Sequence, residues 1–273
     1  MVDTTKLLDR RGAAWLALAG ALVIAVVLSP AAVAGWTSGT HLSVAELPGN
    51  VASGFGQWVA SGRASSAPLA AAVSYWSVFH VVKAAAAIAL LVALLPVGRR
   101  IWGAWARASS RGPRTGLLLV GVLGAAVAPL VLLVAMANVQ GAVAPLSSVL
   151  NFLPLDSAPV AQVRDQLATG ATTPVLTALV DDFRLYHAAL VGTAVAAIVL
   201  VAAGTVALWA RRARTPKPDR RLRRVLTVGA SCSPACSCSS AWYSWRTCPP
   251  SRTRHRPCPR SSTAAGCDPA TVG

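Results

Sequence analysis

Four long apolar segments alternate with basic or polar stretches along the 273-residue chain. Each segment has about 20 residues, which as a helix rising about 1.5 Å per residue crosses a hydrocarbon core of about 30 Å. Backbone groups in lipid must be satisfied within their own segment, so each segment is expected to be a helix. The pattern predicts an all-α, polytopic transmembrane bundle with four spans: Ala13–Val33, Val78–Val97, Gly116–Met136 and His187–Ala210.

Composition agrees with a chain in contact with the lipid bilayer. Hydrophobic residues make up 55% of the chain and charged residues only 12%, whereas a soluble domain carries about 25% charged residues. The net charge of +16 could indicate nucleic acid binding. The basic clusters lie beside the apolar spans, however, where membrane proteins carry them, so we expect no nucleic acid partner.

Basic residues gather in three segments: before the first span, after the second and after the fourth. They are Lys6, Arg10 and Arg11; then Arg99, Arg100, Arg107, Arg111 and Arg114; then Arg211, Arg212, Arg214, Lys217, Arg220, Arg221, Arg223 and Arg224. The long loops 35–77 and 137–186 carry few basic residues. Because basic loops stay in the cytoplasm, we expect a cytoplasmic N-terminus and extracytoplasmic long loops, in a bacterial cell (inner) membrane.

The first span has two interpretations. Basic residues precede it, and Ala32-Val33-Ala34 near its end fits the pattern at which signal peptides are cleaved. Its length also suits a retained membrane helix. We favour the retained helix, and cleavage stays open; the topology of the later spans is the same in both cases.

The second and fourth spans resemble copies that lie 107 residues apart. The matching pairs are Phe79-His80 with Tyr186-His187, Trp102 with Trp209, and Arg107 with Arg214. A chance likeness between alanine-rich helices is the alternative explanation. We expect two helix–outer loop–helix units, residues 13–115 and 116–224, between a cytoplasmic N-terminus (1–12) and a separate tail (225–273).

The tail differs from the rest of the chain in composition. It holds all six cysteines, Cys232, Cys236, Cys238, Cys248, Cys258 and Cys267. A zinc site would need a second cysteine pair with matched spacing, and disulfides do not suit the reducing cytoplasm. Of residues 231–245, 12 of 15 are Ser, Cys, Trp or Tyr, whose codons mostly begin with T. Read one base earlier, these codons encode apolar residues, so we interpret the tail as the frameshifted remnant of a fifth helix, disordered as written.

Few polar groups lie where they could carry function. His80 and Lys83 share one helical face near the outer end of the second span, and Asp181, Asp182 and His187 lie at the matching end of the fourth. A pair between Lys83 and Asp181 or Asp182 could form an ion gate or an anion site. The favoured interpretation is that Lys83 reaches the outer surface and the acids are solvated.

Five tryptophans near span ends are expected to be interfacial anchors: Trp36, Trp76, Trp102, Trp105 and Trp209. No nucleotide-binding, metalloprotease or serine hydrolase motif occurs. The sequence therefore predicts no catalytic residue, no metal site and no cofactor.

The bias towards Ala, Val and Arg, with Arg greatly exceeding Lys, resembles that of proteins from high-GC bacteria. The whole chain resembles the uncharacterised multi-pass integral membrane proteins of actinobacteria, in general style over the spans and not in any motif. This resemblance implies no activity. We expect a non-enzymatic structural or interaction component of the inner membrane, with a membrane or envelope protein as partner. The alternative is a transporter or channel subunit that uses the Lys83–Asp181/Asp182 cluster.

Overall fold

The computed structural model describes residues 9–39, 42–62, 65–215 and Thr227. These residues form helices and connecting segments, with no strand among them. The helices are α1 Arg10–Thr37, α2 Leu47–Ser61, α3 Ala67–Arg107, α4 Arg111–Val143, α5 Pro145–Val149, the 3-10 helix η2 Leu150–Phe152, α6 Ala158–Ala168 and α7 Pro174–Arg214.

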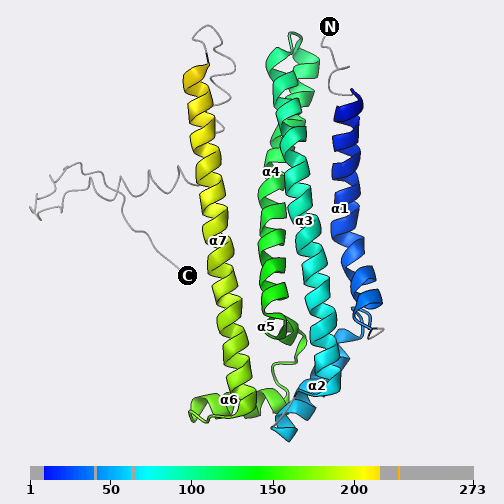
Figure 1. The fold of residues 1–273 in the computed structure, drawn as a ribbon, viewed down its shortest axis with the longest axis vertical. Coiled ribbons are helices and arrows are strands. Elements are labelled where there is room, and N and C mark those ends of the chain that lie inside the picture. Colours follow the sequence, from blue (N-terminus) through cyan, green and yellow to red (C-terminus); the bar gives the residue numbers. More distant parts are fainter. Residues whose placement is uncertain (1–8, 40–41, 63–64, 216–226, 228–273) are drawn as a thin grey trace, which may run out of the picture.

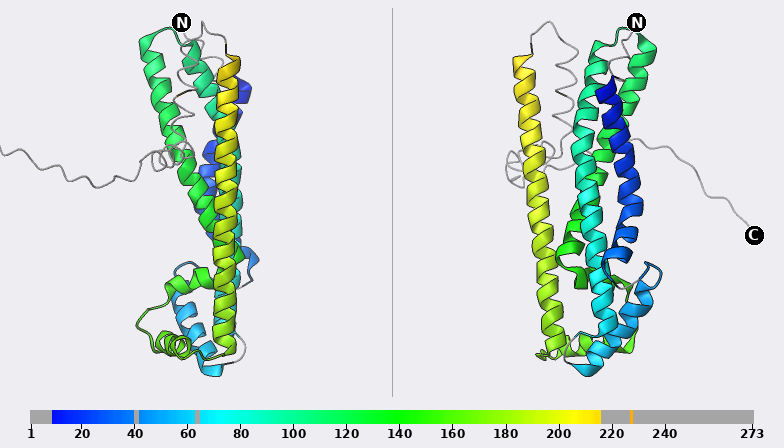
Figure 2. Two further views of the ribbon diagram at one scale, coloured as in Figure 1. Left: turned by 90° about the vertical axis from the view of Figure 1, so that its left-hand side faces the viewer. Right: turned by 45° about the vertical axis from the view of Figure 1, so that its right-hand side comes forward.

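Four long helices stand side by side in a row (Figure 1). Helix α3 packs between α1 and α4, and α7 packs against the far side of α4. The short helices α2, α5 and α6 gather at one end of the row, where α3 and α7 begin, as two further views show (Figure 2). We call this end the cap, and the opposite end, which carries the arginine-rich α3–α4 turn, the basic end.

The expected all-α bundle with four spans is confirmed. The long helices α1, α3, α4 and α7 are each long and apolar enough to cross a membrane. Three of them extend well beyond the predicted spans, because α3 and α7 each have 41 residues and α4 has 33. Extra turns at both ends therefore continue past the membrane-spanning stretch that hydropathy defines.

The largest buried cluster lies in the cap and not among the spans. It joins the ends of α1, α3 and α7 to α2 and α5, and its members are Ala34, Leu47, Val51, Phe55, Trp58, Val59, Leu69, Ala72, Tyr75, Val149 and Val175. Burying a large apolar side chain fully contributes about 1.5–3 kcal/mol. The cap therefore holds α1, α3 and α7 together at one end, while the apolar windows of the long helices are mostly exposed.

Helix α2 approaches the start of α3 closely at Gly54. A Cβ at this position would lie 2.9 Å from the Cα of Leu69, so only glycine permits the contact. The Ser66 hydroxyl donates to the Gly54 carbonyl (2.7 Å) and also accepts from the Leu69 N–H as the N-cap of α3. Gly62, which ends α2, has a φ of 64°, a left-handed conformation that favours glycine.

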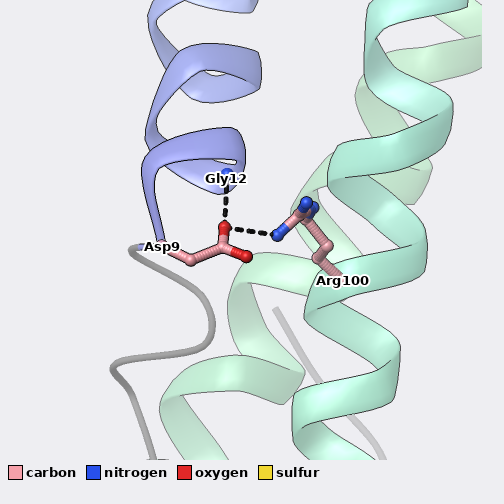
Figure 3. Close-up of polar contacts among 3 residues, drawn as sticks. All are labelled: Asp9, Gly12 and Arg100. Atoms are coloured by element: carbon pink, nitrogen blue, oxygen red, sulfur yellow. Dashed lines mark hydrogen bonds and ion pairs between the residues drawn. The ribbon is translucent and has the colours of Figure 1, made fainter.

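The first helix is tied to α3 at the basic end. The Asp9 carboxylate accepts the Gly12 N–H as the N-cap of α1, and the same oxygen accepts a bond from Arg100 of α3 at 2.8 Å (Figure 3). The Gly12 N–H holds the pKa of Asp9 below its ordinary value of 3.8, and Arg100 adds to this effect. A partly exposed ion pair contributes little energy, and this one links the start of α1 to α3.

The fifth-helix remnant and the disordered tail were predicted for residues 225–273. Apart from Thr227, these residues lie outside the part of the chain that the structure describes.

Candidate functional site

A chain of polar contacts links α3, α4 and α5 where the cap meets the spans. His80 of α3 bonds through Nδ1 to Asn138 Oδ1 of α4 (2.8 Å) and through Nε2 to the Ser148 hydroxyl of α5 (3.0 Å). The Trp76 indole N–H also donates to Ser148 (3.0 Å), and Asn138 donates to the Val134 carbonyl (2.7 Å). We call Trp76, His80, Asn138, Gly141 and Ser148 the His80 cluster.

One tautomer of His80 satisfies every group in this chain of contacts. Asn138 uses its amide N–H on Val134, so its oxygen faces His80 and accepts from an Nδ1–H. Nε2 then accepts from the Ser148 hydroxyl, whose oxygen accepts from Trp76. Buried polar groups are costly in a membrane protein unless they are paired, and here each polar side chain of the cluster has a partner, in the cluster or at the Val134 carbonyl.

Glycine allows the His80 ring to lie directly against α4. A Cβ at Gly141 would overlap the ring of His80. Trp76 lies edge-on to His80 with ring centroids 4.7 Å apart, stacks on Phe79 at 4.7 Å, and meets Phe152 edge-on at 5.1 Å. The cluster is therefore closely packed as well as fully bonded, which suits it to holding α3, α4 and the cap together.

The structure gives the other predicted site residues separate partners. The Lys83 ammonium lies over the Phe79 ring, 5.2 Å from its centroid. Asp181 pairs with Arg184 (3.1 Å) on the exposed face of α7, and Asp182 accepts the Ser147 N–H (2.6 Å) at the start of α5. Among the described residues no ion pair joins Lys83 to either acid. Asp182 thus ties α7 to the cap.

His187 lies apart from the His80 cluster on the exposed side of α7. Its Nδ1 contacts the Phe183 carbonyl one turn earlier (2.9 Å), and its ring lies 4.2 Å from the Phe183 ring. Within the part of the chain described, no other helix supplies it with a polar partner. The two histidines therefore occupy matching positions in sequence and very different surroundings.

The five tryptophans are not alike. Trp36 is 86% exposed at the cap end of α1, and Trp209 is 37% exposed near the basic end of α7, both compatible with an interfacial role. Trp102 lies against Gly121 of α4, and Trp105 stacks under the Arg114 guanidinium. The Trp76 indole N–H is bonded inside the His80 cluster.

Sequence reasoning missed three members of the cluster: Asn138, Gly141 and Ser148. The predicted third span stopped at Met136, so these residues were assigned to an outer loop, whereas α4 continues to Val143. The signal that could have found them is the close spacing of Asn138 and Gln140, two amides placed directly after a long apolar run. Both are buried in the structure.

No group of three His, Cys, Asp or Glu side chains within the described residues is placed to hold a metal ion. Comparison with known proteins found no matching family model, no matching curated protein and no matching solved structure. The chain is a multi-pass helical membrane protein by its four apolar helices, and its function has to be argued from its own residues.

Proposed function

We propose that the chain is a non-enzymatic component of the bacterial inner membrane whose cap contacts a membrane or envelope protein. The observation that supports this proposal is the distribution of packing. The buried apolar cluster and the His80 cluster both build the cap and its junction with α3 and α4, whereas the long spans are mostly exposed. The most tightly packed part of the molecule is therefore the cap, which forms a small platform at the end of the membrane helices.

The orientation in this proposal has the cap outside and the basic end in the cytoplasm. The N-terminal end of α1, the α3–α4 turn and the end of α7 all lie at the basic end (Figure 1), and they carry the arginine clusters that stay inside. Asp9 and Arg100 form an ion pair at this end.

The exposed surface of the cap supplies apolar contact residues. Leu155, between η2 and α6, is 78% exposed, and Leu167 at the end of α6 is 62% exposed. Exposed apolar residues on a rigid platform are typical of a protein contact when they form a patch, although single exposed leucines are common. The question is therefore which molecules contact Leu155 and Leu167 in the cell.

A photo-reactive residue in place of Leu155 or Leu167 tests the proposal in native membranes. We expect one defined protein adduct from both positions, and loss of the Leu167 adduct when Leu155→Asp is added. The control is Leu123 of α4, which is equally apolar and 66% exposed within a span, and which should give lipid adducts. Lipid adducts alone from both cap positions would contradict a protein partner.

A transporter or channel subunit is the second candidate function. The polar side chains of His80, Asn138 and Gln140 favour it, because they lie between packed helices at the edge of the membrane-spanning region. Here Lys83 and the acids Asp181 and Asp182 would act by changing partners. Proton or sodium flux into proteoliposomes, abolished by Lys83→Ala, would support this candidate over the first.

A further inference from the structure

We propose that α1–α3 and α4–α7 are two copies of one unit, and that one face of α7 is the docking surface for a fifth membrane helix. That helix is encoded by the shifted reading frame of codons 231–245 of the same gene. The proposal goes beyond the cap partner and does not depend on it.

The lengths and starting points of α3 and α7 support the duplication. Both helices have 41 residues. Their first residues lie 107 positions apart in the sequence, and so do their last residues. Each begins with the same cap: Ser66 accepts from the Leu69 N–H, and Thr173 accepts from the Leu176 N–H. The Leu positions and the capping positions again differ by 107. Composition alone does not produce equal lengths and equal caps.

The aromatic groups of the two helices also correspond. Trp76, Phe79 and His80 form one set of ring contacts on α3, and Phe183, Tyr186 and His187 form another on α7. In both sets the histidine ring meets the two preceding aromatic rings. The preceding short helices α2 and α6 are also both followed by a glycine with positive φ, Gly62 at 64° and Gly170 at 69°.

The face of α3 that carries His80 and the corresponding face of α7, which carries His187, have different neighbours. On α3, this face is packed against α4: His80 bonds to Asn138, and further along Ala84 and Ala87 are 6% and 0% exposed. On α7, the counterparts of His80 and Ala84 are His187 and Val191. Both side chains are exposed, Val191 by 62%, and Ala194, the counterpart of Ala87, is partly exposed. On α3 this face is covered by α4, the first helix of the second unit, and on α7 no described helix covers it.

The repeat defines what the absent neighbour should look like. Helix α4 follows α3 after a basic turn and runs back along it, with Gly141 under His80 and Gly121 under Trp102. The counterpart should follow α7 after a basic link and run antiparallel to it. It should be apolar, with small residues opposite His187 and Trp209.

When read in the shifted frame, the gene stretch that follows α7 matches this description in its basic link and its apolar character. The basic link Arg211–Arg224 is followed by Val225–Ala230, an apolar start in the written frame. In residues 231–245, 12 of 15 are Ser, Cys, Trp or Tyr. Their codons mostly begin with T, which becomes the central base in the frame one base earlier. A central T encodes only Phe, Leu, Ile, Met or Val, so the apolar run continues.

Nucleotide sequencing of this stretch and mass spectrometry of the natural protein form the first test. We expect an open, apolar shifted frame through codon 245, and tryptic peptides after Arg224 that read in that frame. A stop codon inside the run, or peptides that read only in the written frame, would overturn the proposal.

Disulfide cross-linking in the frame-restored chain, with one base inserted after codon 230, tests the docking surface. Residues 1–231 contain no cysteine, so Val191→Cys can be paired with single cysteines at four consecutive positions, one helical turn, in the fifth helix. The matched control is Val199→Cys, paired with the four consecutive positions of the fifth helix that lie at its own depth, about 12 Å further along α7. Val199 is 59% exposed, and its counterpart Val92 stays 57% exposed on α3 although α3 is packed on two sides.

We expect an intramolecular disulfide with Val191→Cys at one of the four positions and none with Val199→Cys. Equal yields at the two positions would show that α7 offers no specific face. Disulfide-linked pairs of chains through Val191→Cys would make a second copy the occupant. Both results overturn the proposal.

Discussion

The contact between His80 and Gly141 shows how the absence of one Cβ atom can set the distance between two membrane helices. The His80 ring occupies the space where a side chain at position 141 would begin. The ring can then reach Asn138 on α4 and Ser148 on α5 at hydrogen-bonding distance. Polar bonds between membrane helices are worth about 0.6 kcal/mol on average, so the close packing around them matters as much as the bonds.

Gly141→Ala should destabilise the protein, because the added Cβ forces His80 away from α4. Overpacking a close contact costs about 1–3 kcal/mol, and here the polar contacts would be lost with it. Unfolding in detergent, followed by circular dichroism, measures the change. Gly124→Ala is the matched control on α4, since a Cβ there meets nothing within 4 Å. Equal effects of the two substitutions would contradict the assigned role of Gly141.

At the scale of single elements, α1 has its two ends held differently. Near the basic end, Asp9 caps the helix and bonds to Arg100 of α3. At the cap end, Ala34 is completely buried in the apolar cluster. Helix α1 is therefore held to the rest of the bundle at both of its ends.

The attachment of α1 to α3 should weaken in acid. The folded pKa of Asp9 is lowered, so its stabilising effect is complete above the ordinary value of 3.8 and is lost as the pH falls through the lower folded value. Spin labels at Ala14→Cys and Arg99→Cys should show a broader distance distribution in acid than at neutral pH. Asp9→Asn should remove this pH dependence, and an acid response that persisted in Asp9→Asn would assign it to another group.

The mature protein should retain its first helix. Ala34, the residue at which a signal peptidase would cut, lies inside α1 and has 0% exposure within the cap cluster. Removing Arg10–Ala34 would uncover the α3 surface beside Val97 and Ile101, which α1 covers at Gly12 and Leu16. Intact-mass spectrometry of the protein purified from membranes shows whether the first helix is still present. A natural N-terminus at Gly35 would contradict the expectation.

At the scale of the whole molecule, charge and packing are separated along the long axis. The arginines of the α3–α4 turn and of the end of α7 lie at the basic end, and the largest buried apolar cluster lies in the cap (Figure 1). The bilayer accounts for the first part of this division through the retention of basic loops on the inner side. The second part arises because spans surrounded by lipid gain little from burying one apolar face against another.

Cysteine labelling can check the orientation of this axis. With the six tail cysteines replaced by serine, Leu155→Cys in the cap should react with an impermeant maleimide on intact spheroplasts. Ser109→Cys, exposed in the α3–α4 turn, should react only after the membrane is permeabilised. Reaction of Ser109→Cys alone in intact spheroplasts would invert the topology.

The sequence predicted the helical class and the four spans because hydrophobic length is a local property of the chain. The His80 cluster could not be predicted in the same way. Its bonds join residues 58 and 68 positions apart, and they depend on how far α4 continues beyond its last apolar residues. Likewise, the partner of Asp182 is a backbone N–H in α5, a group that a search for opposite charges does not consider.

The length of α3 limits how far the protein can reach. Its 41 residues measure about 60 Å at 1.5 Å per residue, roughly twice the thickness of the hydrocarbon core. Only the first 11 residues, 67–77, precede the predicted span, which raises the cap by about 16 Å. The helix is continuous, so no flexible tether can carry the cap further out. Any protein that contacts the cap must therefore itself lie close to the bilayer surface, which favours a membrane-bound partner.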